Sequence, residues 1–416
     1  MFDYAAYAVP LRRELHQYPE IGFDLPRTLA LVRRELEAMG IPYTEEFGRS
    51  GIVATINAGK PFTIGIRADM DALPITEATG LDYASKIEGQ MHACGHDIHT
   101  AQLLAVGRKL NDMRDELRCC VKLIFTPAEE MIDLEYRQSL IEQGLVKYPS
   151  GKQDMIAGGV FDGVDAVLSC HASGEPGCRF DVGSTLKGFV ILKAVYTGVG
   201  AHAGAMPFAG KNAQHAALLG QTAIAFLKDR FDPADGVNVQ PVISETAGMV
   251  NIVPDRAVVE TYVRARTQKA LFAAADLIEN CLQKCGEAMD IETEVTRRPG
   301  FLPLSQNGEI NALVKENMLL LCGENEILEG LISGASGDVG DLGTLLPTVQ
   351  FGFTGVSGRF HGDDFAIVDE ANACLRPPKV LAGTVLDLFE RPVSGREGFE
   401  ARKAAYLKNW LGSSNA

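Results

Sequence analysis

The sequence predicts an α/β protein with a mostly parallel sheet, interrupted by a smaller α+β segment. Strand-like and helix-like stretches alternate over residues 52–171, which is the order of βαβ units. The stretches 119–125 and 165–171 are apolar with little alternation, as expected for strands that are covered on both faces. Between residues 189 and 297 the order changes to β-α-β-β-α-β, which is typical of a small ferredoxin-like sandwich.

The N-terminal part predicts two helices, followed by alternating strands and helices. The second helix has clear boundary signals, because Pro26 stands in its first turn and Gly40 follows its last residue. In chain order we expect helices at 5–17 and 26–39, strands at 52–58 and 62–68, a helix at 99–116, a strand at 119–125, a helix at 131–144 and a strand at 165–171.

The rest of the chain follows from the same kinds of hydrophobic pattern. We expect a strand at 189–199, a helix at 211–228, strands at 237–244 and 256–265, a helix at 268–288 and a strand at 291–297, then a helix at 309–322, a Gly-rich loop at 333–343, a strand at 348–353, a helix at 369–388 and a short amphipathic piece at 398–411. A chain of 416 residues is too long for a single core. We therefore expect a first domain at residues 1–182 and 298–416, and a second at 183–297.

The composition narrows the classes of function. The formal net charge is −15, which argues against binding to nucleic acid, because such proteins need a basic face. The sequence contains no apolar run of membrane-spanning length, and its start lacks the pattern of a signal peptide. Nine cysteines form no disulfide-scaffold pattern, which favours a reducing compartment. We therefore expect a cytoplasmic protein with neither nucleic acid nor a membrane as partner.

The densest chemical signal is the segment from His92 to His99, HACGHDIH. It holds three of the eight histidines of the chain, together with a cysteine and an aspartate. Imidazole and thiolate groups are the usual ligands of zinc. Cys94 and His96, two residues apart in a Gly-containing loop, are the first candidate ligands, and the alternative is a buried Cys with a capping His. For His92 and His99, ligation and a supporting role remain equally open.

The other reactive side chains come where predicted strands end. In parallel α/β sheets, ligands collect at the carboxyl ends of the strands. The residues at these positions are Asp69 and Asp71 after 62–68, Glu129 and Glu130 after 119–125, His171 at the end of 165–171, and His361 after 348–353. Neighbouring side chains point opposite ways in extended chain, so one glutamate can bind a metal while the other faces the substrate as general base.

Each of the remaining candidates has an ordinary structural alternative. His171 is a candidate ligand or a core histidine, and Asp363 and Asp364 compete with His361 as ligands. His202, among small residues, can donate to an oxyanion. Asn251 is either a substrate contact or a turn residue, and Arg264 either binds a substrate carboxylate or is a solvated side chain. Cys119 and Cys120 are either redox groups or inert thiols.

Six ordered motifs resemble one family, the cocatalytic metallo-amidohydrolases that include hippurate hydrolase, indoleacetyl-amino-acid hydrolases, aminobenzoyl-glutamate hydrolase and N-acyl-amino-acid carboxypeptidases. The motifs are LHQYPEIGF (15–23), IRADMDALPI (67–76), MHACGHDIHT (91–100), FTPAEE (125–130), GVGAHAGAMPFAGKNA (198–213) and GMVNIVPDRAVVE (248–260). The resemblance implies a zinc-peptidase-like catalytic domain with a mostly parallel sheet, and an inserted ferredoxin-like domain that acts as a lid and forms a homodimer.

The resemblance also implies roles for particular residues. Two divalent ions, zinc or manganese, are expected on Cys94, His96, Glu130, His171 and His361. Glu129 is then the general base, and His202 reaches the active site of the partner subunit and steadies the oxyanion. Asn251 contacts the substrate, which is expected to be an N-acyl amino acid or a short peptide with a free carboxylate.

The expected reaction is hydrolysis of the amide bond between an acyl or aryl-acyl group and an amino acid. A dipeptidase or carboxypeptidase of the same fold is the nearest alternative, and an inactive ligand-binding member is a second one. The sequence departs from the family pattern after the glutamate pair, where Met131-Ile132-Asp133 replace the usual glycines, and the segment 131–163 is longer than usual. The loop GDVGDLG and the surroundings of His361 also lack the usual neighbours.

Overall fold

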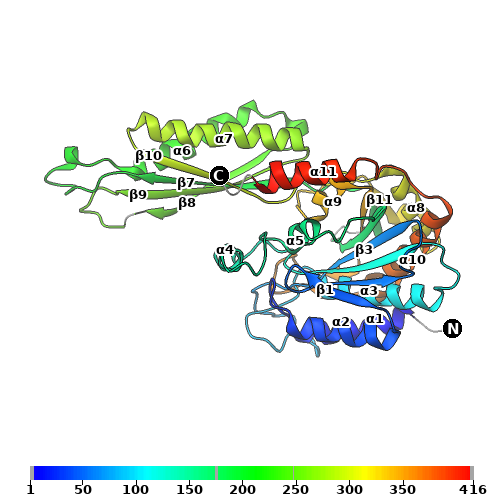
Figure 1. Cartoon of the computed structure of the whole chain (residues 1–416). Helices are drawn as coiled ribbons and strands as arrows, with labels where there is room; N and C mark the ends of the chain where they lie inside the picture. Colours follow the sequence, from blue (N-terminus) through cyan, green and yellow to red (C-terminus); the bar gives the residue numbers. More distant parts are fainter. Residues whose placement is uncertain (1–3, 174–176, 247, 413–416) are drawn as a thin grey trace. The chain divides into compact units, whose positions relative to one another are not determined.

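The computed structural model describes residues 4–173, 177–246 and 248–412, and the chain forms two compact units. The first unit comprises Met1–Thr185, Ser305–Ser333 and Asp341–Lys403. The second unit comprises Leu186–Leu304, Gly334–Gly340 and Ala404–Ala416. Figure 1 labels many of their helices and strands, which are numbered in chain order.

The first unit is built on an eight-stranded mixed sheet. Its order is β1 (Tyr43–Phe47), β2 (Gly51–Ile56), β4 (Cys120–Thr126), β3 (Thr63–Asp69), β5 (Ala166–Ala172), β12 (Thr348–Phe353), β6 (Phe180–Val182) and β11 (Ile327–Glu329). The central pairs β4–β3, β3–β5 and β5–β12 are parallel. The pairs β1–β2, β2–β4 and β12–β6 are antiparallel. The predicted α/β class with a mostly parallel central sheet is therefore confirmed.

The helices of the chain outside the inserted sandwich are α1 (Tyr4–Gln17), α2 (Pro26–Met39), α3 (His96–Asp112), α4 (Leu134–Glu142), α5 (Gly151–Ala157), α8 (Gly308–Leu319), α9 (Val339–Leu345), α10 (Arg376–Glu390) and α11 (Phe399–Ala405). Helix α2 begins and ends at the predicted residues, and Gly40 takes the left-handed conformation (φ 66°) that closes many helices. Helix α3 is buried over most of its length, because it packs on α1, α10 and β3.

Three local predictions differ from the structure. Helix α3 begins at His96 rather than at residue 99, so His96 and His99 lie in the first turn of a buried helix and not in a loop. The predicted loop 333–343 runs into α9. Strands β1, β6 and β11 were not predicted, because each has only three to five residues and shows no hydrophobic period.

The second unit is a four-stranded antiparallel sheet with two long helices. In chain order it contains β7 (Gly188–Thr197), α6 (Ala213–Leu227), β8 (Asn238–Thr246), β9 (Arg256–Ala265), α7 (Gln268–Ala288) and β10 (Glu292–Pro299). The sheet order is β10-β7-β9-β8, as in ferredoxin-like sandwiches. Helices α6 and α7 pack on each other and on one face of the sheet (Figure 1). Among the described residues, no helix combines the length and apolarity needed to cross a bilayer.

Candidate metal centre and active site

The first unit brings all five predicted metal ligands, and Glu129, into one cluster. Potential ligand atoms lie within 4.8 Å of one another in each of three overlapping groups, namely Cys94–His96–His171, Cys94–Glu130–His361 and His96–Glu129–Glu130. These residues come from four separate places in the chain, which the parallel strands β3, β4, β5 and β12 carry to one edge of the sheet. Thiolate, imidazole and carboxylate together form a donor set that suits zinc and related divalent ions.

Two residues of the cluster stand on unusual backbone. Gly95, between Cys94 and His96, has φ +86°, and an added Cβ there would lie 3.3 Å from the Ala172 methyl carbon. His361 has φ +59°, a left-handed conformation that is uncommon for residues other than glycine. The amide of His361 donates to the carbonyl oxygen of Ala93 at 2.9 Å, which ties the two ligand segments together. A non-glycine residue such as His361 keeps this conformation only where its surroundings hold it, and such residues gather at functional sites.

Hydrogen bonds orient two of the imidazole rings toward the cluster. The Nδ1–H of His96 donates to the carbonyl oxygen of Asp71 at 2.8 Å, and that of His171 donates to the carbonyl oxygen of Ala172 at 2.8 Å. Because a carbonyl only accepts, the Nδ1 of each ring carries a proton, which leaves Nε2 as the atom that can bind a metal once the ring is neutral. The Nε2 of His96 is buried without a hydrogen-bond partner among the described residues, and that of His171 lies 3.7 Å from Cys94 Sγ. Oriented, unpartnered nitrogens of this kind fit a bound metal.

Burial and neighbouring groups shift the pKa values of two histidines of the cluster in opposite directions. Hydrogen bonds to Cys94 and Glu130 raise the pKa of His361 to about 10, and the Nε2 of His361 lies 3.1 Å from Glu130 Oε1. Burial lowers the pKa of His171 to about 4, so this ring is held neutral near pH 7. Only a neutral imidazole coordinates a metal, so an ion bound here would displace a proton from His361.

The two glutamates follow β4 on a tight turn and do not point in opposite directions. Carboxylate oxygens of Glu129 and Glu130 lie within 4.8 Å of each other and of a His96 nitrogen. The alternation expected for extended chain does not apply, because β4 ends at Thr126 and Ala128 has φ +52°. The amides of Glu129 and Glu130 donate to the two carboxylate oxygens of Asp71, each at 3.1 Å. Sequence reasoning placed Asp71 at this edge but did not assign it this function.

His99 and His92 lie behind the cluster. The Nε2 of His99 accepts from the amide of Ala172 at 3.2 Å, and burial lowers the pKa of His99 well below its usual value. His99 also belongs to a possible ligand group with Asp69 and His96, but Asp69 forms an ion pair with Arg67. His92 is 1% exposed, and its ring nitrogens have no hydrogen-bond partner among the described residues. His92 belongs to none of the possible ligand groups of the described residues, and the Nε2 of His99 is already hydrogen-bonded, so supporting roles are favoured for both.

Cys119 and Cys120, the candidate redox thiols, and Asp363 and Asp364, the alternative metal ligands to His361, belong to none of the possible ligand groups of the described residues. Burial raises the pKa of both Cys119 and Cys120, which disfavours the thiolate that redox chemistry needs. Asp363 and Asp364 form ion pairs with Arg359, at 2.9 and 3.4 Å.

A buried ionic network supports the first turn of α3. The Nε of Arg12 lies 2.7 Å from Asp97 Oδ2, and both side chains are at most 1% exposed. The Nδ1 of His16 lies 2.8 Å from the same carboxylate oxygen, and its Nε2 lies 3.3 Å from Glu77. This network joins α1 to the helix that begins with His96. Sequence analysis missed it, because its members are far apart in the chain.

Replacing Asp97 with Asn is expected to lower the free energy of unfolding by about 3 kcal/mol, because it leaves the buried guanidinium of Arg12 without a counter-charge. The measurement is denaturant unfolding of both proteins. Glu14→Gln is the matched control, since the ion pair of Glu14 with Arg34 is half-exposed and is worth less than about 1 kcal/mol. Equal losses in the two variants would contradict a special contribution of the buried network.

The three remaining candidates lie in the second unit, and the structure does not bring all of them together. His202 forms a β-bridge with Ile252, and the amide of Ala203 donates to the carbonyl oxygen of Asn251, so His202 and Asn251 share one end of the sandwich. Arg264 lies at the far end of β9, about 26 Å along the strand from Arg256. Its guanidinium lies over the rings of Phe189 and Tyr262, at 5.8 and 5.5 Å, and the side chain is half-buried.

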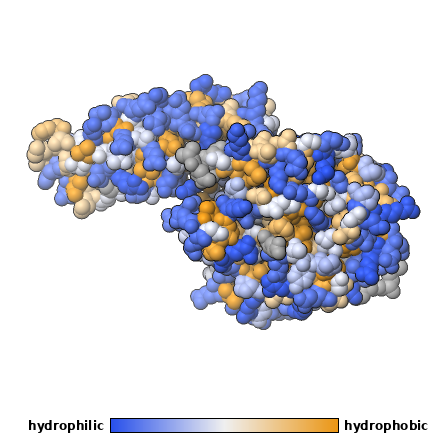
Figure 2. Space-filling model, in the orientation of Figure 1, coloured by the Kyte–Doolittle hydropathy of each residue, from blue (hydrophilic) through white to orange (hydrophobic). Residues whose placement is uncertain are grey.

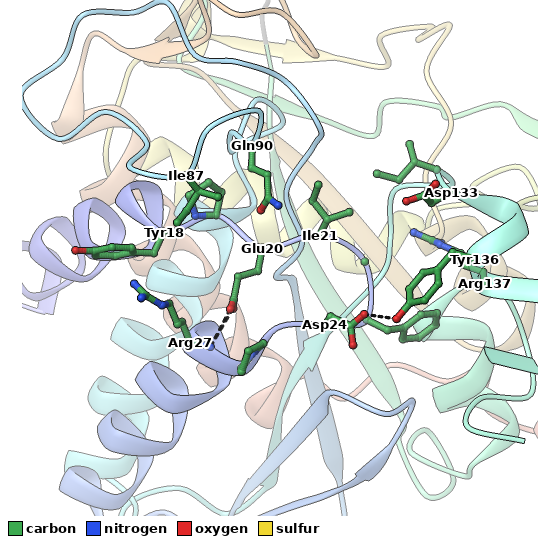
Figure 3. A pocket seen from close by; sticks show the side chains of 15 residues that line it. Tyr18, Glu20, Ile21, Asp24, Arg27, Ile87, Gln90, Asp133, Tyr136 and Arg137 are labelled. Atoms are coloured by element: carbon green, nitrogen blue, oxygen red, sulfur yellow. Dashed lines mark hydrogen bonds between the residues drawn. The ribbon is translucent and has the colours of Figure 1, made fainter. Parts of the chain in front are cut away.

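A pocket of about 490 Å³ lies beside the segment that follows the glutamate pair (Figure 3). It is lined by Tyr18–Asp24, Pro26, Arg27, Ile87, Gln90, Ile132, Asp133, Tyr136 and Arg137. None of the nine candidate site residues lines this pocket, so it is separate from the ligand cluster. Four of its lining residues, Ile132, Asp133, Tyr136 and Arg137, belong to the segment 131–163, which is longer than the family pattern predicts.

Comparison with known proteins gives the family. The model of peptidase family M20/M25/M40 matches residues 65–381. The chain is 28% identical to "IAA-amino acid hydrolase ILR1-like 5" of Arabidopsis thaliana, over 86% of this chain and 80% of that protein. It is 32% identical to "N-acetyl-L-cysteine deacetylase" of Bacillus subtilis, over 74% and 71%.

The fold agrees with a solved structure of a putative aminohydrolase from methicillin-resistant Staphylococcus aureus. The TM-score is 0.79 at 27% identity, and the match covers 92% of this chain and 97% of the other. The family model spans most of the chain, including all five predicted metal ligands and both glutamates. The chain therefore belongs to the M20/M25/M40 peptidase family and is a hydrolase of amide bonds.

Proposed function

We propose that the protein is a metal-dependent amidohydrolase that cleaves the amide bond of N-acyl or aryl-acyl amino acids. The observation that carries this proposal is the cluster around Cys94, His96 and Glu130. Ring nitrogens of His171 and His361 also lie within 4.8 Å of potential ligand atoms in this cluster. A cluster with oriented imidazoles and a second carboxylate beside it fits hydrolysis by an activated water. Two relatives are named as an IAA-amino acid hydrolase and an N-acetyl-L-cysteine deacetylase, and these names favour amino-acid conjugates as substrates.

We assign two divalent ions, zinc or manganese, to Cys94, His96, Glu130, His171 and His361. The three overlapping ligand groups offer more donors than a single tetrahedral ion uses, which supports two ions. When bound, such ions supply Lewis acidity and lower the pKa of a coordinated water. The chain itself sets the geometry of the donors through the carbonyl oxygens of Asp71 and Ala172.

Glu129 is proposed as the general base. Its carboxylate adjoins the ligand atoms of His96 and Glu130, and its side chain is only partly buried. In this role Glu129 accepts the proton of the attacking water and then delivers it to the nitrogen of the leaving amino acid. The Asp71 carboxylate, which accepts from the amide of Glu129, fixes the backbone of the base.

His202 is proposed to donate a hydrogen bond to the developing oxyanion. Its Nδ1 accepts from the amides of Gly204 and Ala205, at 3.2 and 3.1 Å. The proton of the neutral ring therefore resides on the exposed Nε2, which is the atom that an oxyanion needs as donor. Asn251, beside His202, is proposed as a substrate contact. Arg264, at the other end of β9, is proposed as a second substrate contact. The inserted domain at 183–297 is proposed to act as a lid.

The second unit is also proposed to form a homodimer, so that His202 serves the active site of the partner subunit. Strand β8 pairs only with β9 and is an edge strand of the described sheet. Its Val242 is 56% exposed, and Leu218 and Phe226 on α6 are 45% and 74% exposed. An unpaired edge beside exposed apolar side chains is typical of a protein interface. Figure 2 shows hydrophobic residues on the visible face of this unit as well.

A cytoplasmic location is proposed for the protein. All nine cysteines are free thiols, and five of them are buried in the first unit. Free thiols persist in reducing compartments, whereas secreted proteins commonly pair them.

The test is hydrolysis of a substrate panel by the purified full chain. The panel contains hippurate, N-acetyl amino acids, indoleacetyl amino acids, aminobenzoyl-glutamate and dipeptides, with added zinc or manganese and with or without chelator. We expect cleavage of at least one acyl conjugate, and we expect the chelator to abolish it. Cleavage of dipeptides alone would favour a dipeptidase. Chelator-resistant cleavage, or none by metal-loaded protein, would contradict the proposal.

A further inference from the structure

We propose that Arg137 is a positioning residue that holds the Glu129–Glu130 turn in its catalytic geometry. The inference rests on the proposed function, since it concerns the same general base. It assigns a role to the segment after the glutamate pair, where the chain departs from the family pattern. Arg137 itself contacts backbone atoms of the turn and is not a catalytic residue.

Arg137 is a buried arginine on the first turns of α4. Its side chain is 2% exposed and lies over the ring of Phe23 at 5.7 Å. The Nη1 donates to the carbonyl oxygens of Ala128 at 3.3 Å and Pro149 at 2.7 Å. The Nη2 donates to the carbonyl oxygen of Glu130. A buried guanidinium that donates mainly to backbone carbonyl oxygens fixes the path of the chain.

The turn is thereby held from two sides. On its amide side, the Asp71 carboxylate accepts from the amides of both glutamates. On its carbonyl side, Arg137 donates to the residues on either side of Glu129. The left-handed Ala128 at the start of the turn is fixed further, because its amide donates to Gly22 at 3.1 Å. A strained residue of this kind keeps its conformation only while such contacts persist.

The guanidinium also lies close enough to four acidic residues to interact with their charges. The carboxylates of Asp71, Glu129, Glu130 and Asp133 all act on its pKa, although burial is the largest influence and lowers that pKa. Lysine could keep the charge at this position, but it lacks the planar fork that reaches several carbonyls at once. The proposal therefore depends on the shape of the group as well as on its charge.

An ordinary structural role would give a different result from a positioning role. A residue that only stabilises α4 should lower the melting temperature when it is replaced, and leave the rate per folded molecule unchanged. A residue that positions the base should lower kcat with little change in KM, because the misplaced base acts mainly in the transition state. The split between kcat and KM therefore separates the two roles.

The test compares Arg137→Met with Arg27→Met in the full chain at saturating metal. Arg27 is a matched control, because it lines the opposite side of the same pocket and stacks on Tyr18 without contacting the turn (Figure 3). For Arg137→Met we expect kcat to fall about 100-fold, and KM to stay within about three-fold, at unchanged metal content by elemental analysis. Arg27→Met should keep the wild-type kcat.

Two results would overturn the proposal. One is a folded, metal-loaded Arg137→Met protein with wild-type kcat. The other is a loss of kcat that follows the loss of bound metal alone. If the Met variant does not fold, Arg137→Lys decides: we expect kcat about 10-fold lower, whereas wild-type kcat would overturn the positioning role. Failure of the proposed function is distinct, because the wild-type chain itself would then cleave no substrate of the panel.

Discussion

Replacing Glu129 with Gln is expected to lower kcat by about 1,000-fold while the bound metal remains. The amide keeps the size of the carboxylate and its polar contacts, but it cannot accept a proton from the attacking water. The metal should remain because the five proposed ligands are unchanged and the Glu129 amide still donates to Asp71. The measurement is steady-state hydrolysis of the best panel substrate, together with elemental analysis of the same preparation.

The matched control is Glu135→Gln, which makes the same chemical change at an exposed position on α4. This variant should keep the wild-type kcat, because Glu135 belongs to none of the ligand groups of the described residues. A Glu129→Gln protein with near wild-type kcat and full metal content would show that another group takes the proton.

The second large effect is expected for His96→Ala. His96 belongs to three of the four possible ligand groups among the described residues, and every other candidate belongs to at most two. Removing a ligand should weaken metal binding by about 100-fold or more, since loss of a supporting partner alone costs up to that amount. Activity at limiting metal should fall in parallel. The measurement is the dissociation constant for zinc, obtained by calorimetric titration of the metal-free protein.

Folding must be separated from metal binding in this variant, because His96 is fully buried and its ring leaves a cavity. Thermal unfolding in the presence of chelator measures the loss of stability caused by the cavity, without any contribution from metal binding. The control is His215→Ala, since His215 lies on α6 in an exposed position. A His96→Ala protein that folds and binds zinc as tightly as the wild type would remove His96 from the ligand set.

Much of the fold could be predicted because its signals are local. Pro26 and Gly40 mark the ends of α2, and the apolar runs at 119–125 and 165–171 predict buried strands, which are β4 and β5. The change to β-α-β-β-α-β predicts the sandwich of the second unit, whose sheet order agrees with it. The expected gathering of ligands at the strand ends also follows from topology, because parallel strands end at one edge.

The parts that could not be predicted depend on contacts between distant residues or on backbone atoms. Asp71 accepts from two backbone amides, and Arg137 donates to three backbone carbonyl oxygens. Every residue carries such backbone groups, so the sequence does not show which of them a side chain binds. The start of α3 was placed too late, because Gly95 precedes it in a left-handed conformation without a side-chain cap. The directions of the two glutamates depend on the φ angle of Ala128, which the sequence alone does not reveal.

The most direct test of the central claim is a count of metal ions against activity. Metal-free full chain would be titrated with zinc or manganese, and hydrolysis of the best acyl conjugate would be measured at each ratio of metal to protein. The account predicts that activity is absent without metal and reaches its plateau at about two bound ions per chain. Full activity in protein shown by elemental analysis to hold no metal would contradict it.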